Sequence, residues 1–271
     1  MSSLRVVKAH AYGNDFLCAP AHEAGNDLPA LARAMCHRHQ GIGADGLLLY
    51  TLRDSGATMK LLNADGSWSE LSGNGLRCLA ALIARAQDLR PETTVMVDTD
   101  AGVKRLDLLA REGERYTFRA AMGQPTNLRQ TTIDAAGESV TATVLEVGNP
   151  QCIVLGPLPD ADRFNRLGPA LATHPMFPAG TNVEFVHVET PYRVRILIWE
   201  RGVGPTTSSG TGSSASAVVA AAHGGAVRAV DVVAPGGTQR VEWEDDGIYL
   251  TGWAEIVLEG IWTGTNHEPR T

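Results

Sequence analysis

The sequence has neither a hydrophobic run long enough to span a membrane nor a cluster of lysine and arginine residues. Its net charge is −7, from 23 basic and 30 acidic residues, which argues against a nucleic-acid or anionic-membrane surface, although net charge alone does not exclude a local basic patch. The first residues, MSSLRVVKAHAYGNDF, contain no apolar stretch of the length that a secretory signal needs. We therefore expect a soluble, cytoplasmic protein with no nucleic-acid or membrane partner.

Paired cysteine motifs are also missing. Cys18, Cys36, Cys78 and Cys152 are scattered, with no C-x-x-C spacing, so neither a zinc site nor a disulfide framework is indicated. We expect them to be small buried hydrophobic residues. With 271 residues, 44% hydrophobic and 20% charged, the chain can form one large core or two medium ones.

Two pairs of matching segments indicate that the chain is duplicated. AYGNDFL at 11–17 resembles EVGNPQCIV at 146–154, and LSGNGLRCLAALIARA at 71–86 resembles SSGTGSSASAVVAAA at 208–222. Asn14 and Asn149 are separated by 135 positions, and Ser72 and Ser209 by 137. Two matches in the same order at nearly the same offset predict two similar halves.

Each half contains short apolar runs and one long alanine-rich segment. The runs at 46–50, 94–98, 182–188 and 193–199 predict strands, and the segments 76–87 and 213–223 predict buried helices, with a further helix at 27–39. We expect an α+β protein of two pseudo-symmetric lobes, each rich in strands around a central helix. Glycine and proline in AMGQPTN (121–127) indicate the junction, so the lobes are 1–121, with 255–271 returning to it, and 122–254.

The motif S-G-[NT]-G precedes the alanine-rich helix in both halves. N–H groups without helical partners and a partial positive charge make a helix N-terminus an anion site, and glycine lets a ligand approach the backbone. Plain N-capping by serine is the alternative. Because the motif occurs twice at matching positions, we expect both helix N-termini to face the cleft between the lobes and to hold one small anionic group.

Other polar residues stand in similar contexts. Asn63 in NADGS and Asn182 in GTNVEF are candidates for ligand contacts, with a turn and a strand start as the structural alternatives. Glu200 and Arg201 follow an apolar run shortly before the second glycine motif, where they would suit an amino-acid ligand or form an ordinary surface pair.

Together these stretches resemble the diaminopimelate epimerase family of amino-acid epimerases and racemases that work without pyridoxal phosphate. HAYGNDF, RHQGIGADGLLL, LNADGS, ELSGNGLRC, GNPQC, GTNVEF and ERGVGPTTSSGTG follow the order and spacing of that family over nearly the whole chain. The resemblance implies two barrel-like lobes around central helices, an active site between them, and no cofactor. It also implies proton transfer at the α-carbon by two cysteines, one at each glycine motif.

The resemblance carries over by position. It implies amino-acid binding by side chains along the chain, namely Asn14, Asn63, Asn149, Asn182, Glu200 and Arg201. It implies backbone donors to the α-carboxylate at Gly73, Asn74, Gly210 and Thr211. The two cysteine positions are occupied by Ser72 and Ser209, and the family's histidine in GNPH is Gln151.

These replacements change the chemistry. A serine hydroxyl is a far weaker acid than a thiol and needs an adjacent base, and glutamine cannot accept a proton at neutral pH. Glu200 is the best remaining base, and Ser72, Ser209 and Gln151 mark the rest of the catalytic set. We expect a cofactor-free isomerase acting at the α-carbon of a small amino acid or related carboxylic acid.

Two alternatives stay open: a diaminopimelate epimerase whose cysteines were replaced in the laboratory, and a non-catalytic amino-acid binder. Gln151 argues against the first, because trapping a ligand would not need that change. A homodimer is compatible with the resemblance and with exposed strand edges, although the sequence does not fix the oligomeric state.

Overall fold

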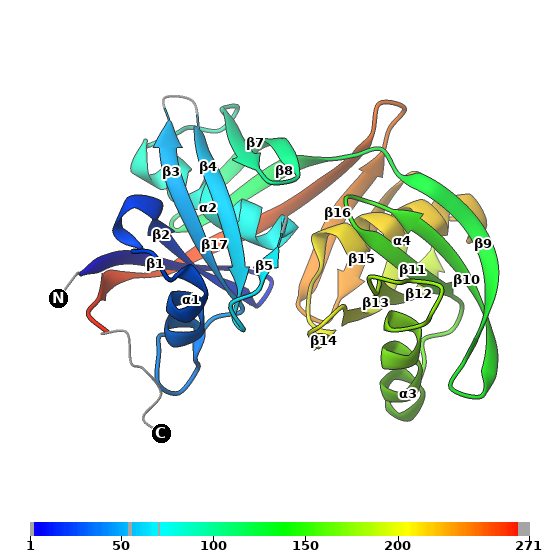
Figure 1. The fold of residues 1–271 in the computed structure, drawn as a ribbon. Helices are drawn as coiled ribbons and strands as arrows, with labels where there is room; N and C mark the ends of the chain where they lie inside the picture. The colour runs from blue at the N-terminus through cyan, green and yellow to red at the C-terminus, as the bar shows by residue number, and fades with distance from the viewer. Residues whose placement is uncertain (1–2, 54–55, 70, 265–271) are drawn as a thin grey trace, which may run out of the picture. The chain divides into compact units, whose positions relative to one another are not determined.

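The computed structural model describes residues 3–53, 56–69 and 71–264. The chain forms two compact units, the first of Met1–Ala120 with Trp253–Thr271 and the second of Ala121–Gly252 (Figure 1). The chain passes from unit 1 into unit 2 within strand β8 (Arg115–Gly123) and returns within β17 (Ile248–Trp262).

Unit 1 is a closed barrel of strands around a helix. Its other elements are β1 (Leu4–Ala11), β2 (Asn14–Pro20), the 3-10 helix η1 (Ala21–Glu23), α1 (Leu28–Cys36), β3 (Gly46–Arg53), β4 (Gly56–Asn63), β5 (Trp68–Ser69), α2 (Gly73–Ala86), β6 (Thr94–Thr99) and β7 (Gly102–Glu112). Pairing runs from β17 through β1, β2, β3, β4, β6 and β7 to β8, and β8 pairs with β17. Closure of this kind leaves these strands without a free edge.

Unit 2 repeats this arrangement. Its elements are β9 (Thr126–Ala135), β10 (Glu138–Glu146), β11 (Pro150–Leu155), α3 (Ala161–Ala172), β12 (Asn182–Thr190), β13 (Arg193–Glu200), β14 (Gly204–Thr206), α4 (Gly210–His223), β15 (Ala229–Ala234) and β16 (Gly237–Trp243). Pairing runs from β9 through β10, β11, β12, β13, β15 and β16 to β17. The directions of strand pairing match between the units. Pairing is parallel, then antiparallel, then parallel along β11, β12, β13 and β15, and likewise along β2, β3, β4 and β6. The predicted α+β fold of two similar strand-rich lobes is confirmed.

The central helices α2 and α4 are buried on nearly all sides. Helix α2 packs against β1, β2, β3 and β6, and α4 against β10, β11, β12, β13, β15 and β16. In unit 2 the core includes Ala215, Val218 and Val219 from α4 together with Ile196 and Val232 from the strands. Small apolar side chains let these helices fit inside a ring of strands.

Both central helices begin three residues earlier than the apolar pattern indicates. The glycine motifs form the first helical turns, with Ser72 and Ser209 at the N-cap positions. Glycine is a poor helix former, so the apolar pattern alone places the start too late. Helix α3, which the sequence analysis did not predict, is capped by Asp160 and contains Pro169, a residue that usually ends helices.

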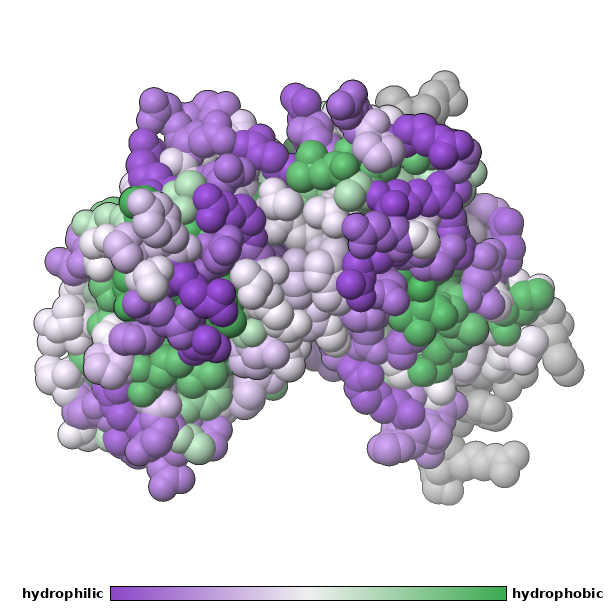
Figure 2. Space-filling view, turned by 180° about the vertical axis from the view of Figure 1, so that it is seen from behind, coloured by the Kyte–Doolittle hydropathy of each residue, from purple (hydrophilic) through white to green (hydrophobic). Residues whose placement is uncertain are grey.

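Hydrophilic side chains cover much of the face in Figure 2, with separate apolar patches. Large exposed apolar side chains include Val257, Leu258 and Ile261 on β17. Over the described ranges no helix is both long and apolar enough to cross a membrane.

Candidate active site

The two glycine motifs form matching helix N-termini, one in each unit. We call Ser72–Gly75 with its surrounding side chains the first helix mouth, and Ser209–Gly212 with its surroundings the second. The hydroxyl of Ser72 accepts a hydrogen bond from the Gly75 N–H at 3.1 Å, and that of Ser209 from the Gly212 N–H at 3.0 Å. Each serine is thus the N-cap of its helix, as the N-capping interpretation of the motif predicts.

Capping uses only an oxygen lone pair, so each serine hydroxyl can also donate its own proton. The Ser209 hydroxyl lies 3.4 Å from the Thr211 hydroxyl, which can accept that proton. The neighbouring N–H groups point out of the helix end, where the helix dipole is positive. Both helix mouths therefore have the geometry that favours a carboxylate. Gly73 and Asn74, and Gly210 and Thr211, lie in the first helical turns, and their role as donors to a ligand stays a prediction.

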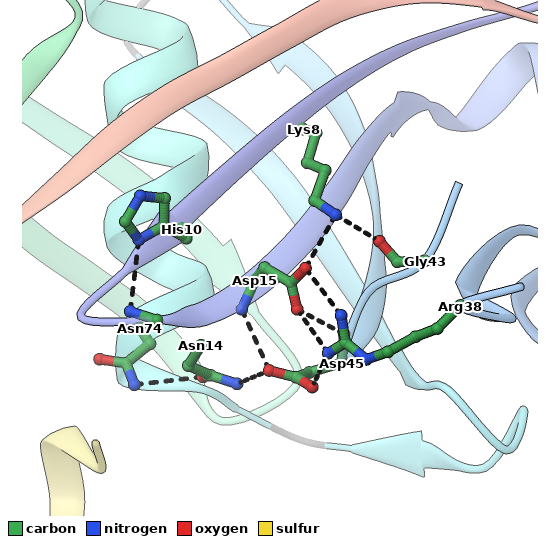
Figure 3. Close-up of polar contacts among 9 residues, drawn as sticks. Lys8, His10, Asn14, Asp15, Arg38, Gly43, Asp45 and Asn74 are labelled. Carbon is green, nitrogen blue, oxygen red and sulfur yellow. Dashed lines mark hydrogen bonds and ion pairs between the residues drawn. The ribbon is translucent and has the colours of Figure 1, made fainter. Parts of the chain in front are cut away.

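A charged network holds the predicted substrate contact Asn14 at the first helix mouth (Figure 3). The Asn74 amide nitrogen donates to the Asn14 oxygen at 3.1 Å, and the Asn14 amide nitrogen donates to Asp45 at 2.6 Å. Arg38 donates to Asp45 at 2.6 Å and to the two oxygens of Asp15 at 2.9 and 3.2 Å. Both ends of the Asn14 amide are fixed, so its orientation is determined by the protein.

Asp15 is the buried anion of this network. Burial alone would raise the pKa of Asp15, but hydrogen bonds from Arg38 and Lys8 outweigh it and hold the pKa below its usual value. The Lys8 ammonium lies 2.9 Å from Asp15 and also donates to the Gly43 carbonyl at 2.6 Å. Ionised Asp15 therefore links β1, β2 and the segment before β3.

Asn63, at the end of β4, is held within its own turn. Its amide nitrogen donates to the Ser67 hydroxyl at 2.9 Å, and its backbone N–H donates to the Ser67 carbonyl at 2.8 Å. The turn interpretation of NADGS thus describes its local contacts, and ligand binding by Asn63 stays a prediction.

Strand register gathers the polar residues of the second helix mouth. Gln151 on β11 pairs with Asn182 on β12, and Glu184 lies two residues further on the same face. Glu184 pairs with Ile198 on β13, which places Glu200 diagonally opposite on the same face.

The Gln151 amide satisfies its neighbours when its nitrogen points towards Glu184. It then donates to the two Glu184 carboxyl oxygens at 3.0 and 3.2 Å. Its oxygen accepts from the Thr211 hydroxyl at 3.2 Å and from the Asn182 amide at 3.3 Å, and lies 2.5 Å from the Asn149 side chain. Gln151 therefore connects three residues of the predicted substrate-binding set, Asn149, Asn182 and Thr211, to a carboxyl group that the sequence analysis did not single out.

Glu184 is completely buried. Burial raises the pKa of its carboxyl group well above the usual range, and repulsion from Glu200 adds to the rise. A Cβ atom at Gly212 would lie 2.2 Å from a Glu184 carboxyl oxygen and 3.0 Å from the Ser209 hydroxyl, so the carboxyl group abuts the first turn of α4. The signal for Glu184 in the sequence is one acidic residue within the apolar run NVEFV.

The two helix mouths differ in what lies beneath them. In unit 1, Phe16 pairs with Gly46 and Leu48 with Leu61, so Phe16 stands at the register of Gln151 and Leu48 at that of Glu184. A Cβ atom at Gly75 would meet the Phe16 ring at 3.3 Å instead of a carboxyl group. The duplicated fold thus places an aromatic and an aliphatic side chain where unit 2 has an amide and an acid.

Arg201 lies on the turn after β13, beside a cavity of about 550 Å³ that Trp199, Pro169 and Pro178 also line. Its backbone N–H donates to the Asn182 side-chain oxygen at 2.9 Å, and its guanidinium donates to the Ala179 carbonyl at 3.0 Å. The structure thus brings Asn182 and Arg201 together, and their contacts with a ligand stay a prediction.

The four cysteines are free and buried. Burial raises the pKa of Cys18, Cys36 and Cys152 to about 12, and that of Cys78 well above its usual value. None is a thiolate at neutral pH, so none replaces the thiols that the family resemblance implies at positions 72 and 209. No three His, Cys, Asp or Glu side chains in the described ranges gather in a way that could hold a metal ion.

The family profile described as diaminopimelate epimerase matches residues 6–128 and 143–257. The chain belongs to the diaminopimelate epimerase family. A diaminopimelate epimerase from Desulforudis audaxviator is 41% identical over 281 residues, covering 96% of this chain and 99% of its own. One from Desulfitobacterium hafniense is 37% identical over 279 residues, covering 95% and 98%.

Solved structures share the fold of this family member. A hydroxyproline epimerase from Agrobacterium vitis, crystallised with trans-4-hydroxy-L-proline, has a TM-score of 0.72 at 18% identity, covering 99% of this chain and 93% of its own. The predicted family and fold are confirmed, and the chain is an enzyme of the isomerase class, with diaminopimelate epimerases among its relatives. The roles of the individual site residues stay predictions.

Proposed function

We propose that this isomerase moves a proton at the α-carbon of a small amino acid or related carboxylic acid, without a cofactor and by a route that diverges from two-thiol epimerisation. The observation that carries the proposal is the pair of serine-capped helix mouths at equivalent positions in a member of the diaminopimelate epimerase family. The small-molecule substrate follows from the names of its relatives.

In this proposal the helix mouths bind the substrate carboxylate. Backbone N–H groups at Gly73, Asn74, Gly210 and Thr211 stabilise it and the negative charge that develops when the α-proton leaves. Asn14, held by Asp45 and Asn74, and Asn182, held by Arg201, present amides of fixed orientation to the amino acid. Asn63, Asn149 and Arg201 complete the proposed contacts.

Proton transfer is assigned to the second helix mouth. Glu200 is the proposed base, with the Ser209 hydroxyl able to relay the proton and Gln151 to orient its neighbours. Strand register makes Asn63 the equivalent of Glu200 in unit 1, because Gly46 pairs with Asn63 just as Asn182 lies opposite the end of β13. The Asn63 amide does not titrate. One-sided chemistry at the α-carbon is what this asymmetry supports, with Ser72 binding rather than transferring a proton.

Proton NMR in deuterium oxide tests the proposal with a panel of amino acids that includes diaminopimelate. Deuterium should enter at Cα of at least one member, and Glu200→Gln should abolish the entry. The surface variant Glu112→Gln is the matched control and should leave the rate unchanged, because Glu112 is exposed on β7.

Two outcomes would replace the proposal. A ligand that binds tightly with no exchange at Cα would identify a non-catalytic binder. A Ser72→Cys, Ser209→Cys double variant that epimerises diaminopimelate, beside a wild type with no exchange, would identify a diaminopimelate epimerase that lacks its two thiols.

A further inference from the structure

Glu184 is a buried carboxyl group that the proposed function leaves without a task. It lies on β12 between the apolar residues Val183 and Phe185, and its side chain is fully enclosed. The equivalent strand β3 carries Leu48 at the same register, and that residue is also fully buried. The barrel therefore does not require an acid at this position in order to fold.

The groups that face Glu184 come from three elements. From β11, the Gln151 amide lies 3.0 and 3.2 Å from its two oxygens, and the Cys152 thiol is close enough to interact electrostatically. From β13, Glu200 is close enough to repel it. From α4, the Gly212 backbone contacts its carboxyl group beside the Ser209 hydroxyl. Glu200 is the other carboxyl group in this set.

Two neighbouring carboxyl groups cannot both be ionised cheaply in a buried site, so they share one proton over a wide pH range. The proton stays on the group for which ionisation costs more. Glu184 is fully enclosed, whereas Glu200 is only half-buried at the end of its strand. Gln151 cannot take part in this exchange, because an amide does not titrate near neutral pH.

We infer that Glu184 is a positioning residue of the second helix mouth, which holds the exchangeable proton of the Glu184–Glu200 pair and so leaves the negative charge on Glu200. Glu184 does not touch the substrate in this inference. It rests on the proposed function only for the role of Glu200 as base. The protonation of Glu184 itself can be measured without any substrate.

Infrared difference spectroscopy of the full chain at neutral pH tests the inference, by comparing spectra in water with those in deuterium oxide and wild type with variants. Wild-type protein should show one protonated carboxyl C=O band that shifts in deuterium oxide. Glu184→Gln should lose the intensity of one carboxyl group, and Glu200→Gln should keep it, since Glu184 stays buried. Among the residues that the structure describes, other carboxyl groups with shifted pKa values do not interfere, because their pKa values are lowered: Asp15, Glu23, Asp65, Glu138 and Glu189.

Substitutions at Gln151 provide a second arm that leaves both carboxyl groups in place. Gln151→His puts an imidazole next to Glu184, which should take the proton as a buried ion pair and remove the band. In the Gln151→Met variant, the methionine side chain has a volume similar to that of glutamine and cannot titrate, so the Glu184 carboxyl band should remain. Circular dichroism confirms that each variant is folded before its spectrum is interpreted.

The inference is overturned if wild type has no acid band at neutral pH, or if the band survives Glu184→Gln and disappears in Glu200→Gln. Neither result depends on catalysis. A Glu184 band together with no deuterium exchange for any substrate would instead refute the proposed function alone, so the two failures can be told apart.

Discussion

At the scale of single residues, Ser72 and Ser209 combine a structural and a chemical role. Each hydroxyl accepts the N–H of the third helical residue and still has a proton to donate. The capping role could be read from the S-G-x-G spacing because it depends only on local geometry. Glu184 could not be identified in this way, since its importance depends on the register of β12 with β11, which precedes α3 in the sequence, and with β13.

Removing either cap should destabilise the protein. Ser72→Ala and Ser209→Ala each lose the acceptor for one N–H, and the free energy of unfolding should fall by about 1 kcal/mol in urea titrations. Ser→Gly at the same positions is the control and should cost only a few tenths of a kcal/mol, because glycine is also a good N-cap. Equal losses for alanine and glycine would contradict the capping role.

Asp15 should give the protein an acid-sensitive contribution to stability. Its folded-state pKa is lowered, so its ionised form stabilises the fold at neutral pH, and this contribution is lost as the pH falls below the unfolded value of about 4 and through the folded pKa. Asp15→Asn should therefore be less stable than wild type at pH 7, with a gap that narrows on acidification. Urea titrations across this pH range measure the gap, and a gap that stays constant would contradict the assignment.

At the scale of elements, the alanine-rich segments predict α2 and α4 because burial on all sides is visible in composition alone. Helix α3 was not predicted because Pro169 and Gly168 interrupt its apolar pattern. In the folded protein, Gly168 fits against the Trp199 ring, where a Cβ atom would lie 2.6 Å from a ring carbon. Tertiary contacts of this kind override helix propensity and cannot be read from one segment.

Alanine substitutions at the equivalent glycines of the two central helices, Gly75 and Gly212, should destabilise the protein by unequal amounts. At Gly212 a new Cβ atom would collide with the buried Glu184 carboxyl group at 2.2 Å, whereas at Gly75 it would meet the Phe16 ring at 3.3 Å. Alanine gains roughly 1 kcal/mol of helix propensity at either position. We therefore expect Gly212→Ala to be the more destabilising by about 1–3 kcal/mol, the typical cost of overpacking.

Chemical denaturation of the two glycine variants measures this difference directly. The double variant Gly212→Ala, Glu184→Ala removes the colliding carboxyl group, so the alanine at 212 should cost less in that background than in wild type. Equal costs in both backgrounds would show that the collision with Glu184 is not the cause.

At the scale of the whole molecule, the duplication predicted the architecture because two units with the same element order build the same barrel. The chemical difference between the units could not be predicted from the duplication itself. Phe16 and Gln151, or Leu48 and Glu184, become equivalent only when strand register is known. A symmetric fold thus carries an asymmetric set of titratable groups.

Truncation after Gly252 should unfold unit 1 and spare unit 2. Strand β17 pairs with β1 through residues 255–262, and β17 also pairs with β8. Loss of residues 253–262 therefore opens the barrel of unit 1 and exposes two strand edges. Unit 2 is made of residues 121–252 and keeps all of its own strands in this variant. Hydrogen exchange followed by mass spectrometry should therefore show amide protection lost in α2 and β1–β7 and retained in α4 and β10–β16.

Truncation after Gly264 is the control, because it keeps every β1–β17 pair and should leave both units protected. Protection lost equally in both units after truncation at 252 would mean that unit 2 depends on unit 1 for its stability, and that the two halves of the duplication fold as one cooperative unit.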